Sequence, residues 1–85
     1  MVMSIKMKIN PEILVRNAQK WLLTKQAEIN AGNTVKWMQI YGWVEFKLAE
    51  VGGLKFTVHV DDSFQDVVPV IEDALGEVKV WFDNL

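Results

Sequence analysis

The sequence predicts an α+β domain of the ferredoxin-like (split βαβ) class, with the element order β-α-β-β-α-β. Three observations lead to this prediction: strand-like alternation of apolar and polar residues near both ends of the chain, two segments with helical periodicity, and a glycine pair between two alternating segments. In this fold a four-stranded antiparallel sheet carries two helices on one face. The last strand lies beside the first, and the first beside the third.

Length and composition are those of one globular domain covering residues 1-85. The chain has 85 residues, of which 51% are hydrophobic and 24% charged, and its net charge is −2. It contains no cysteine, which excludes a disulfide scaffold, a zinc ribbon and a cysteine nucleophile. No apolar run is long enough to cross a bilayer, and the first residues lack the apolar segment of a signal peptide. We therefore expect a soluble, cytoplasmic protein that does not bind membranes.

The first strand is expected over residues 4–9, where Ile5, Met7 and Ile9 share one side. Asn10 and Pro11 then have the residue types of a helix N-cap and a first helical residue. The helix is expected over residues 11–30, with Gly32 as its left-handed stop. Its apolar stripe consists of Leu14, Val15, Ala18, Trp21, Leu22 and Ile29.

The middle of the chain alternates between apolar and polar residues without a change of phase across Gly42. This pattern favours one long strand from Val35 to Glu50, bent at the glycine, that lies at an edge of the sheet. A tight hairpin around Tyr41-Gly42 is the alternative, ranked second because it places Met38 on the same side as Glu45.

The pair Gly52-Gly53 predicts a hairpin. A three-residue loop, Val51-Gly52-Gly53, with Gly53 at positive φ, brings apolar residues opposite one another. The expected pairs are Leu48 with Phe56, Phe46 with Val58, and Val44 with Val60.

A second helix is expected after Asp61, on the apolar positions Phe64, Val67, Val68, Ile71 and Leu75. Pro69 predicts a kink there, or a turn followed by a short helix that begins at the proline. Gly76 is expected to end this helix. Residues 77–83 alternate and form the expected last strand. The predicted inward side chains are Ile5, Met7, Ile9, Met38, Ile40, Val44, Phe46, Leu48, Leu54, Phe56, Val58, Val60, Val78, Val80 and Phe82.

Catalytic and metal-binding patterns are missing from the sequence. The single histidine, His59, and the lack of cysteine rule out a Cys–His pair and a site with several histidines. No glycine motif for nucleotide phosphates occurs. We therefore expect no enzyme, no cofactor and no metal. His59 is expected opposite Glu45 as the partner of a carboxylate. The acidic residues Asp61, Asp62, Asp66, Glu72 and Asp73 are expected to form a solvated face, with docking on a basic partner as the alternative.

The outer face of the predicted sheet carries the candidate partner-binding residues. They are large aromatics and lysines: Trp37, Tyr41, Trp43, Trp81, Lys47, Lys55 and Lys79. Tyrosine and tryptophan are enriched in binding hot spots. The prediction is a non-catalytic protein-interaction module, an inhibitor or regulator that occupies a larger protein's surface or pairs with a second copy. The contact is the outer sheet face or the edge strand. In size and character the chain is similar to small inhibitors such as phage counter-defence proteins.

The alternative function is binding of single-stranded nucleic acid on the same face. Aromatic side chains among lysines have the right chemistry for stacked bases and phosphates. Two features place this function second. The aromatics fall on the predicted edge strands, whereas RNA-binding sheets carry them on the central ones. The net charge of −2 also opposes binding to phosphates.

Overall fold

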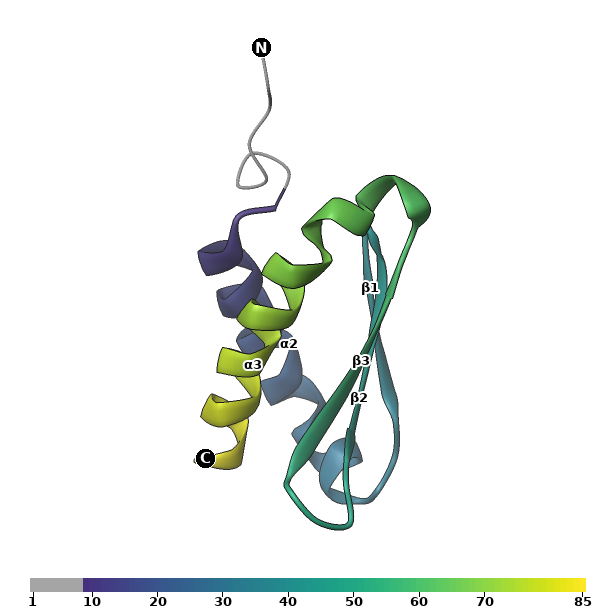
Figure 1. Ribbon diagram of the computed structural model, residues 1–85. Coiled ribbons are helices and arrows are strands. Elements are labelled where there is room, and N and C mark those ends of the chain that lie inside the picture. The colour runs from purple at the N-terminus through teal and green to yellow at the C-terminus, as the bar shows by residue number, and fades with distance from the viewer. Residues whose placement is uncertain (1–8) are drawn as a thin grey trace.

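The computed structural model describes residues 9–85, which form two layers, a pair of helices and an antiparallel sheet (Figure 1). The elements are α2 (Pro11–Asn30), β1 (Val35–Gln39), β2 (Gly42–Leu48), β3 (Leu54–Val60), the 3₁₀ helix η1 (Asp62–Val67) and α3 (Val68–Asp83). The strands lie in the order β1-β2-β3. Both helices cover the same face of the sheet (Figure 1). They run in the same direction, because an odd number of antiparallel strands, three, separates them along the chain.

The α+β class is confirmed, but the ferredoxin-like prediction of a four-stranded sheet is wrong. The sheet in the described residues has three strands, and the element order is α-β-β-β-η/α. The predicted first strand, 4–9, lies outside the described residues except for Ile9, which is buried and lies two residues before the start of α2. The predicted last strand, 77–83, is helical.

Helix α2 has the predicted bounds. The side chain of Asn10 accepts hydrogen bonds from the backbone N–H groups of Glu12 and Ile13 at 3.0 and 3.2 Å. Pro11 follows as the first helical residue, where a missing N–H group leaves no acceptor unpaired. Gly32 has a φ of +92° after the helix. Local capping residues therefore define both ends of this element.

Helix α3 continues through Gly76 and occupies the segment predicted as the last strand. Val78 and Phe82 are buried together with Ile71 and Leu75, at a spacing that places all four on one helical face. Val80, which a strand would bury beside them, is 62% exposed. Three apolar residues at i, i+2 and i+4 fit the strand period and, in part, the helix period. Here the longer helical pattern determines the structure.

The middle segment is a hairpin, so the prediction of one long edge strand is wrong. Strands β1 and β2 pair Gln39 with Gly42 and Trp37 with Val44, which leaves Ile40 and Tyr41 as the loop. This loop starts one residue earlier than the alternative hairpin at Tyr41-Gly42. Both two-residue turns pair residues of opposite parity and place Met38 on the same side as Glu45, which is opposite to the side that a continuous strand gives it. As a consequence Trp37 is buried in the core, whereas Met38 and Ile40, predicted to point inward, are 63% and 81% exposed.

The second hairpin keeps the predicted faces but not the predicted register. Leu48 pairs with Leu54, Phe46 with Phe56, and Val44 with Val58, a displacement of two residues on β3. Residues 49–53 connect the strands, so the three-residue loop is wrong. The prediction of positive φ at Gly53 is confirmed, at +82°. An even displacement leaves every side chain on the same side of the sheet.

The core lies between the sheet and the two helices. Val44 and Phe46 of the central strand are fully buried, as are Leu22 of α2 and Leu75 of α3. Trp21 of α2 packs on Trp37 and Phe46, with ring centroids 6.1 and 6.2 Å away. None of the helices in residues 9–85 is both long enough and apolar enough to span a membrane.

Candidate functional site

The side of the sheet away from the helices is the candidate binding surface, and we call it the outer sheet face. Alternation along the strands assigns to it the side chains of Lys36, Met38, Trp43, Glu45, Lys47, Lys55, Thr57 and His59. Each is exposed or half-buried, whereas Val44 and Phe46, which point to the opposite side, are fully buried.

The structure gathers only three of the predicted partner-binding residues, Trp43, Lys47 and Lys55, on the outer sheet face. The expected outward placement of Trp37 and Tyr41 is wrong. Both belong to the core, where their exposed fractions are 6% and 2%. The two-residue turn that replaces the expected continuous strand explains this difference, because it pairs Trp37 with Val44 and leaves Tyr41 in the turn itself.

The other two candidates, Trp81 and Lys79, lie on α3 because the expected last strand is a helix. Both side chains are half-buried there, Trp81 with its ring against that of Phe82 at 6.2 Å. The outer sheet face therefore does not include them. Lys36 and Met38 join the face instead, and sequence reasoning missed them because their side depends on whether the segment is a hairpin or one continuous strand.

Trp43 lies at the centre of a cluster that crosses all three strands. The imidazole of His59 on β3 stacks on its indole, with centroids 4.5 Å apart and planes inclined by 15°. The ammonium group of Lys36 on β1 lies 4.6 Å from the indole centroid, in a cation–π contact. The indole N–H donates to Glu45 Oε2 at 3.2 Å. Neighbours from both flanking strands therefore hold this tryptophan in place.

Glu45 and His59 touch as predicted, although they are not directly opposed. Thr57 lies opposite Glu45, and Trp43 lies opposite His59. The contact runs diagonally, with Glu45 Oε2 and His59 Nε2 3.4 Å apart. This pair becomes an ion pair only when the imidazole is protonated. Both side chains are more than a third exposed, whereas the Nε2 atom of His59 is itself buried without a hydrogen-bond partner in the described residues.

Lys47 and Lys55 form a basic pair at the other end of the outer sheet face. They are directly opposed on β2 and β3, and both are exposed. Within the part of the chain that the structure describes, no carboxylate pairs with either ammonium group. Like charges opposite each other destabilise a sheet. This corner therefore carries positive charge that the fold itself does not neutralise.

A surface depression of about 390 Å³ lies beside Lys55, at the end of β3. It is lined by Ala49, Val51, Gly52, Leu54, Lys55, Phe56 and Lys79, a largely apolar set that also includes two lysines. Lys55 therefore belongs both to the basic pair and to the lining of this depression.

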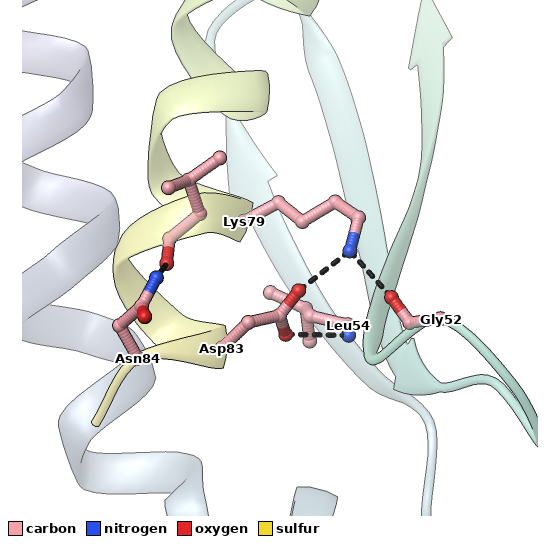
Figure 2. Close-up of polar contacts among 6 residues, drawn as sticks. Gly52, Leu54, Lys79, Asp83 and Asn84 are labelled. Carbon is pink, nitrogen blue, oxygen red and sulfur yellow. Dashed lines mark hydrogen bonds and ion pairs between the residues drawn. The ribbon is translucent and has the colours of Figure 1, made fainter.

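Two hydrogen bonds hold α3 to the strand end beside this depression, and a third joins Lys79 to Asp83 within the helix (Figure 2). Lys79 Nζ donates to the carbonyl oxygen of Gly52 and to Asp83 Oδ2, both at 2.6 Å. Asp83 Oδ1 accepts from the backbone N–H of Leu54 at 2.9 Å. The hydrogen bond from Lys79, with that from Leu54, holds the pKa of the Asp83 carboxyl below its usual value. The positive charge of Lys79 is thus already matched by a carboxylate.

The predicted acidic face lies on the helix layer. Its carboxylate residues Asp61, Asp62, Asp66, Glu72 and Asp73 are all exposed, along η1, α3 and the residue before them. Among residues 9–85, no three His, Asp or Glu side chains converge as a metal site would require. Negative charge on the helix layer and unneutralised positive charge on the outer sheet face give the molecule two electrostatically different sides.

We compared the chain with protein-family models, with curated proteins and with solved structures. None of the three comparisons gives a match.

Proposed function

We propose that this protein is a protein-binding module whose outer sheet face docks on an acidic surface of a larger protein. The observation that carries the proposal is the directly opposed, unneutralised pair of Lys47 and Lys55. Two facing ammonium groups cost stability in the free protein, and an acidic partner removes that cost on binding. Lys36 adds a third positive charge on the same face.

The outer sheet face also offers an apolar contact area. Met38 is 63% exposed and lies directly opposite the half-buried Trp43. Methionine and tryptophan are both enriched in protein interfaces, where apolar anchors surrounded by polar groups supply much of the affinity. An acidic patch with an apolar centre therefore matches this face in charge and in chemistry.

The structure supports a protein partner over single-stranded nucleic acid. Base stacking requires open aromatic rings, but two of the four proposed aromatics, Trp37 and Tyr41, are buried in the core. The indole of Trp43 already contacts His59 and Lys36, so a base would have to displace one of them. Both observations count against stacked bases on this face and support a protein partner.

Affinity capture with the tagged protein, followed by binding measurements with the purified partner, tests this proposal. The double variant Lys47→Glu/Lys55→Glu should lower the affinity by about tenfold or more and weaken its salt dependence. The matched control, Arg16→Glu/Lys20→Glu, makes the same charge change at exposed positions of α2 and should retain binding. Equal losses in both variants, or no loss in the first, would contradict the proposal. Recovery of RNA or DNA as the specific ligand would favour the alternative.

A further inference from the structure

We propose that the open edge of β3 binds an extended segment of the partner by strand addition, and that this segment alternates acidic and apolar residues. The inference rests on the proposed function and names the partner's binding mode. Four hydrogen bonds, the burial of β3 and the charge of Lys55 carry it.

The hydrogen bonds show which backbone groups of β3 point away from the sheet. The carbonyl of Gly53 and the N–H of Asp61 bond toward β2, to Ala49 and Tyr41 at 2.9 Å each. In an antiparallel strand the N–H and C=O of one residue point to the same side, and successive residues alternate. The odd-numbered residues of β3 therefore bond to β2. The even-numbered ones, from Leu54 to Val60, point to the free edge.

In the part of the chain that the structure describes, side chains occupy this edge at its two ends and leave its centre open. Asp83 accepts from the N–H of Leu54, and the Gln65 amide donates to the carbonyl of Val60, at 2.9 Å each. Within residues 9–85, no group bonds to the outward N–H and C=O of Phe56 and Val58. An unpaired strand edge is a template for a further strand, and peptide ligands in many complexes bind such an edge.

Side-chain burial specifies apolar residues on one side of the added strand. Phe56 and Val58 are only half-buried, although Phe46 and Val44, their cross-strand neighbours on the same face, are fully buried. The helix layer thus leaves the inner side of the edge partly uncovered. The depression beside Leu54 and Phe56, of about 390 Å³, has room for an apolar side chain of the added strand.

The positive charge of Lys55 specifies acidic residues on the other side of the added strand. Lys55 points to the outer sheet face next to the open edge, and no carboxylate in the described residues neutralises it. Lys47 flanks it on β2, so a residue of the added strand would flank it on the opposite side. A carboxylate there pairs with Lys55 across the strands. Lys79 offers no such attraction, since Asp83 already pairs with it.

Selection from a displayed library of random peptides of about ten residues tests this specificity. The selected peptides should alternate acidic and apolar residues, and the Lys55→Glu variant should select basic residues at the formerly acidic positions. The matched control, Lys20→Glu on α2, should select the same peptides as the unchanged protein. A library that gives no binder, or binders without alternation, would overturn the inference.

Amide hydrogen exchange with a selected peptide bound tests the geometry. The N–H groups of Phe56 and Val58 should exchange at least about tenfold more slowly, whereas that of Thr57, which already bonds to β2, should change little. Unchanged exchange at Phe56 and Val58 would overturn strand addition. The proposed function has a separate outcome. A natural partner that loses affinity for Lys47→Glu/Lys55→Glu, yet leaves those two amides unprotected, supports the outer sheet face and rejects the strand edge.

Discussion

The carboxylate of Asp83 at the end of α3 accepts a hydrogen bond from the backbone N–H of Leu54 at the start of β3, over 2.9 Å. Lys79, which pairs with Asp83, donates to the carbonyl oxygen of Gly52, so the two side chains hold the end of α3 to the start of β3 (Figure 2). We expect Asp83→Ala to lower the free energy of unfolding by about 1 kcal/mol, since bonds to charged groups contribute about 1.5–3 kcal/mol and exposure reduces this. Urea denaturation at neutral pH measures the loss. A variant as stable as the original would show that the contact does not stabilise the fold.

The same contact predicts a pH dependence of stability. The hydrogen bonds from Lys79 and Leu54 hold the pKa of Asp83 below its usual value, so the folded state favours the carboxylate more than the unfolded state does. This stabilisation is complete above the unfolded pKa of about 3.9 and is lost as the pH falls through the lowered folded value. The difference in unfolding free energy from Asp83→Asn should therefore be constant near neutral pH and shrink below about pH 4. A difference that stays the same in acid would contradict this assignment.

Two glycines should respond oppositely to replacement by alanine. Gly42 has a φ of +142°, and a Cβ there would overlap the carbonyl oxygen of His59 on the neighbouring strand. Gly42→Ala should cost at least about 2 kcal/mol, because backbone must move as well as adopt a strained conformation. Gly76 lies within α3 with no atom near its missing Cβ, and Gly76→Ala should stabilise by about 0.5–1 kcal/mol. Thermal melts measure both. Equal effects would contradict the hairpin turn and the continuous helix.

Trp37 and Trp43 provide a test of the two sides of the β1–β2 hairpin. Trp37 is 6% exposed and packs on Trp21 and Phe46, so Trp37→Ala should cost about 3–5 kcal/mol. Trp43→Ala should cost only about 1–2 kcal/mol, because it removes mainly the stack on His59 and the contact with Lys36. Chemical denaturation followed by circular dichroism measures both losses. If Trp43→Ala lowered the stability more than Trp37→Ala, the two faces of the hairpin would be reversed, with Trp43 in the core.

Elements were predicted correctly where neighbouring residues determine them, and wrongly where only packing between distant segments does. Asn10 and Pro11 cap α2 by chemistry within one turn, and its bounds were predicted correctly. The turn at Ile40 and Tyr41 has no such signal, because apolar residues occupy both phases around it. Only packing against α2 decides which side of the β1–β2 hairpin is buried. No neighbouring residue makes Gly76 the end of a helix, so α3 and its apolar face continue past it.

The same distinction applies to the residues of the candidate site. Lys47 and Lys55 were placed on the outer face correctly, since a displacement of two residues on β3 does not change sides. Trp37 and Tyr41 were misplaced, because the expected continuous strand through Gly42 is a hairpin, whose two-residue turn places Trp37 on the same side as Val44. Large aromatic residues offer no help in that choice. They suit a core and a binding surface equally well, as Trp37 and Trp43 show.

Tyr41 should make the protein sensitive to alkaline pH. Its hydroxyl is buried without a hydrogen-bond partner in the described structure, and burial raises its pKa to about 12. The folded state therefore keeps the proton more tightly than the unfolded state, whose tyrosine pKa is about 10, and stability should fall as the pH rises between these values. Tyr41→Phe should remove this loss and raise the unfolding free energy by about 1 kcal/mol, because it deletes an unpaired buried polar group. Tyr41 is the only tyrosine, so tyrosinate absorbance reports this residue alone. Ionisation near pH 10 in the folded protein would show that its hydroxyl reaches solvent and would contradict the burial of this side chain.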